Sequence, residues 1–514
     1  MKKLGLIGGV GPKATLQYYK EIEYGVMKKL GKSVLPEITI ESLSCFKMIP
    51  FGVTQDYEGM TEYILGEVRT LEKANCDFIA LACCTEHMVF DRVARETAIP
   101  MLSLVQVCVS EAKKKKFYMG LTFLCSLGVL GLLKYFDFLL GNVNALLGLA
   151  GIAPVSKPFS IGLPVGISFY TFQSLGYMVD VYRGDTKAER NILNYALFVS
   201  FFPVILSGPI ERSGNLLRQI RELPEKALWN YGRVAGGLTL LLFGLFQKMV
   251  IADRIAILAN QVFDNYHMYG TFGLTVGAIA YTIQIYCDFA GYTDMGRGIA
   301  GLLGFDLLVN FKRPYQADSV QDFWRRWHLS LSSFLRDYVY IPLGGSRRGR
   351  FRRAVNILIT FGVSGIWHGT GFHFLLWGLL HGIGQIFDIK NWKVPRAVKR
   401  VLIFLFVDAT WMVFRVNSLG DLKGMLRVIL TNFRLQDFAG MQLGSFEWVL
   451  LVFGILAVIA KDVLNEKGFA FQSWILERNA VLRCLIYTAL LGAVLIFGVY
   501  GAAYDTSGFL YTQF

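Results

Sequence analysis

Long apolar runs begin at residue 117 and recur to the end of the chain. A helix of roughly 18 or more apolar residues is long enough to cross a bilayer. Such runs lie near residues 117–135, 159–178, 232–252, 271–290, 354–389, 399–415, 447–464 and 483–503, and 354–389 is long enough for two helices. Shorter runs at 136–152 and 194–208 are broken by Gly or Pro, which is typical of helices that neighbouring helices shield from lipid. The pattern predicts about eight to eleven spanning or half-spanning helices.

The first 115 or so residues follow a different pattern, in which charged and apolar positions are mixed. Residues 3–11 read as a short strand followed by a glycine turn, and a helix start follows at Pro12. They contain no hydrophobic segment with a cleavage site, so we expect no signal peptide. The sequence thus predicts a polytopic α-helical membrane protein preceded by a partial soluble α/β domain.

Composition supports this division. Hydrophobic residues make up 54% of the chain and charged residues 18%, whereas a soluble domain carries about 25% charged residues. The net charge of +14 comes largely from short basic connections between apolar runs. These contain Arg325, Arg326, Arg347, Arg348, Arg350, Arg352, Arg353, Lys393, Arg396, Lys399 and Arg400.

Short loops rich in Lys and Arg stay on the cytoplasmic side of a membrane. We therefore expect a multi-pass protein of the plasma or inner membrane, surrounded by lipid, with a cytoplasmic N-terminal segment and no nucleic-acid partner. The basic connections are open to two interpretations, a solvated loop or a contact with an anionic acyl carrier or headgroup.

The eight cysteines show no metal-ligand spacing and no disulfide framework. We expect no metal site and reduced thiols in a cytosolic segment.

Two histidines lie in apolar surroundings. His368 is in the run Gly-Ile-Trp-His-Gly, and His328 is in Trp-Arg-Arg-Trp-His-Leu-Ser. An imidazole inside a membrane domain is costly to bury and usually moves a proton or binds a ligand. The alternative for each is a hydrogen-bonded core histidine.

Five motifs carry a resemblance to a known family. They are Asp-Phe-Ala-Gly-Tyr-Thr-Asp-Met-Gly-Arg-Gly-Ile-Ala at 288–300, Asn-Phe-Lys-Arg-Pro-Tyr at 310–315, Asp-Phe-Trp-Arg-Arg-Trp-His-Leu-Ser-Leu-Ser at 322–332, Leu-Arg-Asp-Tyr-Val-Tyr-Ile-Pro-Leu-Gly-Gly at 335–345 and Ser-Gly-Ile-Trp-His-Gly at 364–369. Residues 163–174 and 201–212 extend the match. Residues 117–514 resemble the membrane-bound O-acyltransferase (MBOAT) family, and within it the branch of the alginate O-acetyltransferases.

The resemblance implies acyl transfer, most simply acetyl transfer, from a cytoplasmic thioester to an extracytoplasmic polysaccharide. The donor would be acyl-CoA or an acyl carrier protein, with no bound cofactor, and the family works with an SGNH esterase-like partner protein. His368 would be the general base, and His328 would orient or polarise a reactant beside it. D-alanyl transfer to teichoic acid is the alternative within the family.

Other polar residues of this region are interpreted as structural. His381 and His373 are expected to pack rather than to react. Asp288 and Asp294 lie in an apolar run and need cationic partners, for which the candidates are Arg297, Arg313 and Arg336.

The N-terminal segment resembles the aspartate/glutamate racemase family through its glycine turn and through residues 79–91 and 99–105. The resemblance covers residues 1 to about 116, one of the two lobes that such enzymes use. By resemblance, the site residues of this remnant are Cys83, Cys84, Thr85 and His87. Racemisation without a cofactor needs acid/base groups on both faces of the α-carbon, and the second lobe has no counterpart, so we expect no racemase activity.

The two parts meet at Lys113–Lys116, and the usual first membrane helices of the family have no counterpart here. A natural fusion and an artefact of recombination or assembly both remain open. An inactive chimera, or a transporter or scaffold that has lost the chemistry, is therefore a further alternative.

Overall fold

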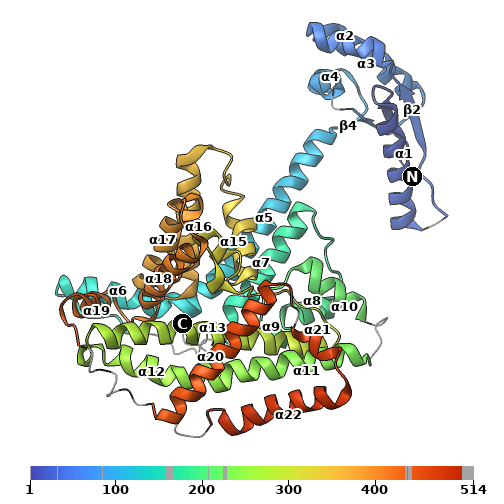
Figure 1. The fold of residues 1–514 in the computed structure, drawn as a ribbon. Coiled ribbons are helices and arrows are strands. Elements are labelled where there is room, and N and C mark those ends of the chain that lie inside the picture. The colour runs from blue at the N-terminus through green and yellow to red at the C-terminus, as the bar shows by residue number, and fades with distance from the viewer. Residues whose placement is uncertain are drawn as a thin grey trace. The chain divides into compact units, whose positions relative to one another are not determined.

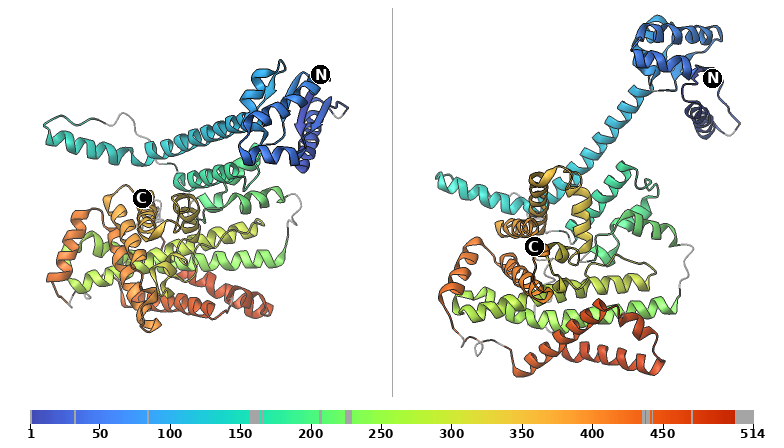
Figure 2. Two further views of the ribbon diagram at one scale, coloured as in Figure 1. Left: turned by 90° about the horizontal axis from the view of Figure 1, so that it is seen from above. Right: turned by 45° about the horizontal axis from the view of Figure 1, so that its top comes forward.

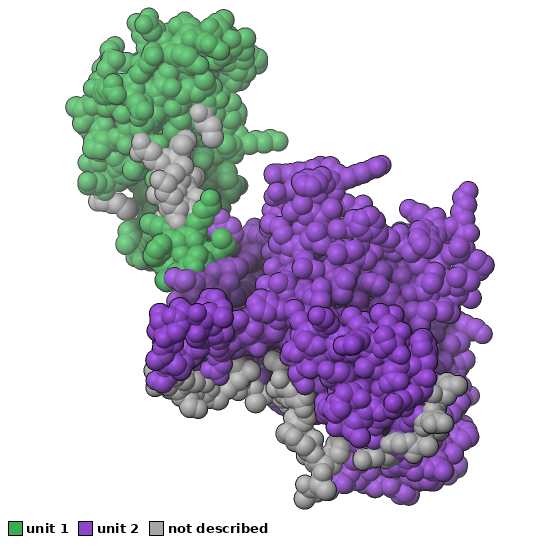
Figure 3. Space-filling view, turned by 90° about the vertical axis from the view of Figure 1, so that its left-hand side faces the viewer, with its two compact units in different colours: residues 1–121 green, residues 122–514 purple. Residues whose placement is uncertain are grey.

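The structure is a computed structural model that describes residues 2–31, 33–83, 85–156, 164, 166–205, 208–223, 229–434, 437, 441, 443–469 and 471–500; the side chains of residues 104–106, 108–113 and 471–472 are left aside. The chain divides into two units, residues 1–121 and residues 122–514 (Figure 3).

The first unit contains a parallel sheet in its described part. Its strands β1 (Leu4–Gly8), β2 (Ile38–Ser42), β3 (Phe78–Leu81) and β4 (Met101–Leu102) are ordered β2-β1-β3-β4. Helices α1 (Pro12–Leu30), α2 (Cys45–Thr54), α3 (Tyr57–Lys73) and α4 (Phe90–Glu96) connect the strands, with the 3-10 turn η1 (Glu86–Val89) before α4. The expected small α/β domain is confirmed.

Helix α3 shows why this unit has a core. Met60, Ile64, Val68 and Leu71 recur at helical spacing and are almost completely buried. They pack with Ile7 and Ile79 of the sheet. The apolar face of α3 and the continuous apolar strands thus bury each other.

Glu86 is a fully buried carboxyl group in the turn after β3. The backbone N–H of Cys83 donates to its Oε2 at 3.3 Å. Burial raises the pKa of Glu86 from 4.5 to about 8, against the opposing effect of the backbone hydrogen bonds from Cys83 and Ala82.

The second unit is helical. Its first helix is continuous from the first unit: α5 (Leu104–Leu130) passes through a π-turn, η2 (Gly131–Tyr135), into α6 (Phe136–Leu149). The helices that follow are α7 (Ile167–Arg183), α8 (Ile192–Val199), α9 (Phe202–Ile205), α10 (Arg218–Arg221), α11 (Tyr231–Leu245), α12 (Asp253–Asp264), α13 (Thr271–Leu302), α14 (Val320–Trp324), α15 (Leu329–Leu335), α16 (Gly349–His368), α17 (Phe372–Ile386), α18 (Arg396–Arg415), α19 (Leu419–Thr431), α20 (Ser445–Glu466), α21 (Phe471–Leu476) and α22 (Ala480–Phe497). The apolar runs 117–135 and 136–152 therefore lie on one continuous helical segment, because the π-turn accommodates Gly131 without ending the helix.

Four helical segments of the described chain are long and apolar enough to cross a membrane: Lys114–Leu149, Tyr231–Asp264, Phe372–Asn391 and Ala480–Phe497. Helices α13, α16, α18 and α20 have 20 or more residues. The spans expected at 271–290, 354–389, 399–415 and 447–464 thus fall on helices of sufficient length. The total of eight to eleven stays a prediction.

Helices α11 and α13 lie side by side in antiparallel directions (Figure 1 and Figure 2). They approach closely at two glycine pairs, Gly237 with Gly298 and Gly244 with Gly291. A Cβ atom on Gly237 would come within 2.8 Å of the Gly298 carbonyl oxygen, and one on Gly244 within 2.6 Å of the Gly291 carbonyl oxygen. Small residues at these positions bring the two backbones together, as is usual between membrane helices.

A buried ion triad lies beside this helix pair. Lys248 is in the π-turn η5 (Phe246–Ala252), and its Nζ is 2.6 Å from both Asp253 Oδ1 and Asp288 Oδ1. The side chains are 11%, 13% and 2% exposed, respectively.

Replacing Lys248 with Met should lower the free energy of unfolding by about 3–5 kcal/mol, because two buried carboxylates lose their shared cation. The measurement is denaturant unfolding of the purified chain in detergent. Arg218→Ala is the control, since the Arg218–Glu222 pair is exposed and its loss should cost less than about 0.5 kcal/mol. Equal effects of the two substitutions would contradict a structural role for the triad.

Glu86 should make the first unit less stable as pH rises. Between 4.5 and about 8 the folded carboxyl keeps a proton that the unfolded one releases, so the free energy of unfolding falls across this window. Amide hydrogen exchange of β3 and α4 in the full chain, corrected for the intrinsic pH dependence of exchange, measures the effect. Glu86→Gln should remove it, and an unchanged pH dependence in that variant would exclude Glu86 as the cause.

Candidate functional site

His368 is the last residue of α16 and is 3% exposed. Aromatic rings surround its imidazole. The ring centroids of Trp367, Trp377 and Phe414 lie 4.8, 4.9 and 5.5 Å from that of His368. The apolar packing holds the imidazole in one place and excludes bulk water from it.

The end of α16 is capped by side chains from the first membrane helix. Lys134 Nζ donates to the carbonyl oxygens of Trp367 and His368, at 2.7 and 3.1 Å, and Tyr135 Oη donates to that of Ile366 at 2.6 Å. The last carbonyls of a helix have no partner within the helix. Lys134 and Tyr135 supply those partners and so fix the turn that carries His368.

His328 immediately precedes α15 and is completely buried. Its backbone has φ of 43°, a left-handed conformation that is unusual for a residue with a side chain. The edge of Phe289 from α13 packs against its ring, with 4.7 Å between centroids. The indole of Trp367 lies 6.3 Å from the His328 ring and, as above, next to His368, so the fold brings the two predicted histidines to the same indole.

Asn310 is the hydrogen-bond partner of His328. Its Oδ1 lies 3.0 Å from His328 Nδ1, 3.3 Å from the Ser330 backbone nitrogen and 2.9 Å from Ser330 Oγ. The Asn310 carbonyl also accepts from Leu329 N–H at 2.9 Å. Asn310 therefore binds both the imidazole and the start of α15.

The other two histidines of this region have the structural surroundings expected for them. His381 is fully buried; Trp324 Nε1 donates to its Nδ1 at 3.2 Å, and its Nε2 is 3.0 Å from Thr410 Oγ1. His373, near the start of α17, packs on Phe374 with 4.2 Å between ring centroids.

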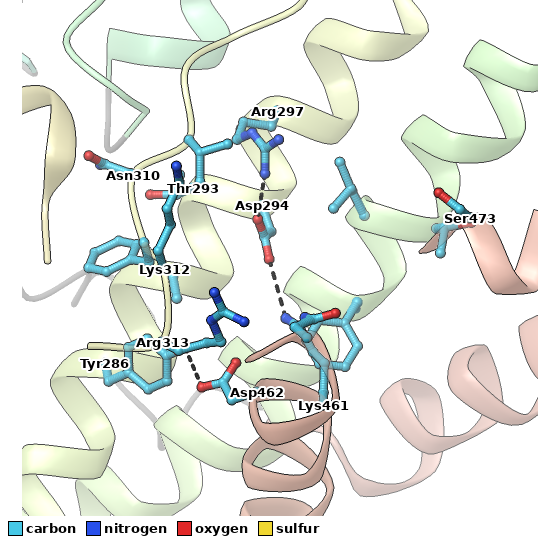
Figure 4. A pocket seen from close by; sticks show the side chains of 17 residues that line it. Tyr286, Thr293, Asp294, Arg297, Asn310, Lys312, Arg313, Lys461, Asp462 and Ser473 are labelled. Atoms are coloured by element: carbon cyan, nitrogen blue, oxygen red, sulfur yellow. Dashed lines mark hydrogen bonds and ion pairs between the residues drawn. The ribbon is translucent and has the colours of Figure 1, made fainter. Parts of the chain in front are cut away.

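Two cavities border the His328 region. The first, here called the Asn310 pocket, has a volume of about 450 Å³ and lies between α11, α13, α20 and the segment 309–313 (Figure 4). Its polar lining includes Asn310, Asp294, Arg297, Lys312, Arg313, Lys461 and Asp462. Figure 4 shows Asp294 between Arg297 and Lys461, and Tyr286 bonded to Asp462.

The second cavity, here called the arginine pocket, has a volume of about 610 Å³. Arg325, Arg336 and Arg353 line it together with Trp324 and Leu329, and its described lining contains no carboxylate. Leu329 directly follows His328. His328 itself lines neither pocket: its hydrogen-bond partner Asn310 lines the first, and the next residue in the chain, Leu329, lines the second.

The expected partners of the two carboxylates are partly wrong. Asp294 does pair with Arg297, at 3.2 Å. Asp288 pairs instead with Lys248, because the close approach of α11 and α13 brings η5 against that turn of α13. Arg313 pairs with Glu466 and Arg336 with the adjacent Asp337.

The racemase-like residues lie near the carboxyl edge of the parallel sheet in the first unit. Cys83 follows β3, Thr85 precedes η1, and His87 Nδ1 is 2.9 Å from the Cys83 carbonyl oxygen. Cys84 lies outside the described residues. Among the residues that the structure does describe, no group of three or more His, Cys, Asp or Glu side chains could hold a metal ion.

Sequence reasoning did not single out Lys134, Tyr135 or Asn310. A lysine inside a long apolar run was the available signal for Lys134, since such a charge needs a partner. Asn310 stands in a quoted motif, but its neighbour His328 is distant in sequence.

Family models match both parts of the chain. The model of the membrane-bound O-acyltransferase family matches residues 188–389, and the model of the Asp/Glu/hydantoin racemases matches residues 7–133. An aspartate racemase homologue from Pyrococcus horikoshii is 36% identical over 22% of this chain and 50% of that one, with a TM-score of 0.21.

Three of the curated relatives that match the chain are the following. The probable alginate O-acetylase of Pseudomonas putida is 36% identical over 339 residues, 65% of this chain and 69% of that protein. The peptidoglycan O-acetyltransferase of Helicobacter pylori is 34% identical, over 61% of this chain and 65% of that protein. The teichoic acid D-alanyltransferase of Bacillus subtilis is 28% identical, over 45% and 60%. Through these matches and its helical membrane unit, the chain belongs to the membrane-bound O-acyltransferase family.

Proposed function

We propose that the chain transfers an acyl group, in the first instance acetyl, from a cytoplasmic thioester to a hydroxyl of an extracytoplasmic polysaccharide. The observation that carries the proposal is the pair of buried histidines beside the indole of Trp367, with the arginine pocket lined by Leu329, the residue after His328. Relatives named for alginate and peptidoglycan O-acetylation support the acceptor class.

The reaction needs a proton acceptor beside the attacking hydroxyl. As the sugar oxygen forms its bond to the thioester carbonyl carbon, His368 takes the hydroxyl proton, and the tetrahedral intermediate then collapses with cleavage of the C–S bond. The leaving thiolate takes the proton from the His368 imidazolium to become the free thiol, which restores the neutral imidazole. A neutral imidazole is suited to this step, because it accepts the proton in place.

The arginine pocket suits the donor. Arg353 belongs to the basic stretch 347–353, which the positive-inside rule assigns to the cytoplasm. Arginine binds phosphate through paired N–H donors, and both coenzyme A and the prosthetic group of an acyl carrier protein carry phosphate. The pocket therefore supports either thioester as the donor.

Several expectations complete the proposal. The enzyme would be a multi-pass protein of the plasma or inner membrane with a cytoplasmic N-terminal unit and an SGNH esterase-like partner outside. Residues 1–116 would form an incomplete racemase-like appendage, and residues 117–514 the acyltransferase domain. Expression in a host without polysaccharide O-acetylation, followed by measurement of released ester, tests the activity; absence of ester with every donor supplied would refute it.

D-alanyl transfer to teichoic acid is the competing activity. The relatives named as teichoic acid D-alanyltransferases are 28% and 29% identical to this chain. The relatives named as O-acetylases or O-acetyltransferases are 34% to 38% identical to it. The same host, supplied with a D-alanyl carrier thioester, would distinguish the two activities by the group released.

His368→Ala should lower turnover by roughly a hundredfold or more, the usual effect of losing a general base. His328→Ala should also impair turnover, with partial rescue in His328→Gln, which keeps a hydrogen-bonding side chain. His373→Ala is the matched control and should change little. The measurement is ester formed per inserted protein, and near-normal transfer by a correctly inserted His368→Ala protein would leave a scaffold or transporter as the better interpretation.

Lys134→Met should lower turnover about tenfold without preventing insertion, because the turn carrying His368 loses two charge-assisted hydrogen bonds. Asn142→Ala is the control: Asn142 lies in the same continuous helix but donates only to Phe138 of its own helix, at 2.7 Å. Equal turnover in the two variants would show that capping of α16 by Lys134 does not position His368.

A further inference from the structure

The Asn310 pocket lies near the cytoplasmic ends of the helices that line it. Arg297 is five residues before the end of α13, and Lys461 is five residues before the end of α20, a distance of about 7.5 Å along each helix. Glu466, the last residue of α20, pairs at 3.1 Å with Arg326 of a basic connection. Because short basic connections face the cytoplasm, the pocket lies close to the cytoplasmic surface of the membrane.

Aromatic side chains mark the same boundary on neighbouring helices. Tyr231 is the first residue of α11, and the guanidinium of Arg483 lies 5.3 Å from its ring centroid. Trp474 of α21, next to the lining residue Ser473, has the guanidinium of Arg478 at 5.1 Å from its ring centroid. Tyr and Trp gather where a membrane meets water, and basic side chains extend to the same level. The pocket therefore lies at the depth of lipid headgroups.

Positive charge exceeds negative charge in the lining of the pocket. The cationic side chains come from α13, from the segment 309–313 and from α20, and they are Arg297, Lys312, Arg313 and Lys461 (Figure 4). The carboxylates of the lining are Asp294 and Asp462. Even if both carboxylates are ionised, the four cations leave an excess of two positive charges. This balance favours an anion as the ligand.

Two of the cations are available to such a ligand. Within the part of the chain that the structure describes, no carboxylate pairs with Lys312. Lys461 Nζ lies 3.9 Å from Asp294 Oδ2, which is beyond hydrogen-bond distance, and 3.9 Å from the ring centroid of Phe243. An ammonium group has three N–H donors. Both lysines can therefore donate to an anion in the pocket.

One wall of the pocket is apolar and belongs to a helix that is apolar enough to cross a membrane. Leu240 and Phe243 of α11 line the pocket, and both lie in the apolar segment Tyr231–Asp264. Beside them, Leu238 of α11 and Leu464 of α20 are exposed, as expected of side chains that meet acyl chains. A soluble phosphate would contact only the cationic part of the pocket, whereas a lipid would also cover the apolar wall.

We propose that the Asn310 pocket binds the phosphate of an anionic lipid of the cytoplasmic leaflet. Lys312, Arg313 and Lys461 contact the phosphate, and the acyl chains leave the pocket along Leu240 and Phe243. Basic pockets between membrane helices on this side suit such headgroups. The lipid joins α13, α20 and the segment 309–313. The inference depends on the membrane orientation proposed above and is independent of the acyl transfer.

The first test measures binding to the purified full chain in neutral detergent by native mass spectrometry. Phosphatidylglycerol and phosphatidylcholine are the lipid probes, and inorganic phosphate and coenzyme A are the soluble probes. We expect the wild type to bind phosphatidylglycerol more tightly than phosphatidylcholine. Lys312→Gln breaks no ion pair of the described chain and should weaken phosphatidylglycerol binding about fivefold, the effect of one basic side chain at a membrane surface. Coenzyme A binding should be the same in both proteins.

Lys393→Gln is the matched control. Lys393 is an exposed lysine of another basic connection and lines neither the Asn310 pocket nor the arginine pocket. The same loss of charge at this position should leave phosphatidylglycerol binding unchanged. Equal weakening by the two substitutions would reduce the effect to general surface charge and overturn the proposal.

Two further outcomes of the first test would also overturn the proposal. One is equal binding of phosphatidylglycerol by the wild type and Lys312→Gln. The other is binding of inorganic phosphate or coenzyme A that depends on Lys312 while phosphatidylglycerol binding does not, which would assign the pocket to a soluble phosphate.

The second test locates the lipid on the full chain. Phosphatidylglycerol with a photoreactive diazirine in its acyl chain is bound and irradiated, and the labelled peptides are identified by mass spectrometry. We expect labelling of α11 around Leu240 and Phe243, reduced about fivefold in Lys312→Gln and unchanged in Lys393→Gln. Labelling spread over other helices, with no loss in Lys312→Gln, would overturn the Asn310 pocket as the site of the lipid.

Discussion

Helix α13 is held in register by buried polar contacts to three different partners, and the histidine site depends on that register. Thr282 donates to Asp408 of α18 at 2.6 Å, Tyr286 donates to Asp462 of α20 at 2.9 Å, and Asp288 meets Lys248. In an apolar surrounding a displaced polar group finds no water to replace its partner. Sliding α13 by one residue would break all three contacts together. The next residue after Asp288, Phe289, packs on His328, and Ala290, Thr293 and Asp294 line the Asn310 pocket.

The two histidines of the site lie at the ends of helices and not in the middle of helices. His368 ends α16 and His328 precedes α15. Helix ends leave backbone groups without partners within the helix, and here long-range side chains supply them. Lys134 and Tyr135 bind the carbonyls of α16, and Asn310 binds the backbone at the start of α15. The same hydrogen bonds that complete these helix ends therefore also orient the two imidazoles.

The sequence predicted the parts of this arrangement that depend on local chemistry. The apolar runs, the α/β segment and the two histidines could all be found without coordinates, since solvent preference and residue type determine them. The partner of Asp288 could not, because it depends on glycine contacts between α11 and α13 that place Lys248 there. The role of Lys134 could not be predicted for a related reason. Its hydrogen-bond partners are more than two hundred residues away in the sequence, and no sequence periodicity connects them with Lys134. The continuity of the helix through the π-turn at 131–135 was also not predicted, since the sequence shows two separate apolar runs there, 117–135 and 136–152.

Lys134 lies on the same continuous helical segment as residues 113–116, where the two parts of the chain meet. The join at Lys113–Lys116 lies within α5, roughly five helical turns before Lys134. Because α5 continues through η2 without a break, the helix that enters from the racemase-like unit is the one that caps α16. A residue inserted between the join and Lys134 would turn the helix by about 100° per residue unless a bulge absorbed it. Lys134 and Tyr135 are themselves the last two residues of the bulge η2, so the direction of both capping side chains depends on the geometry of this π-turn.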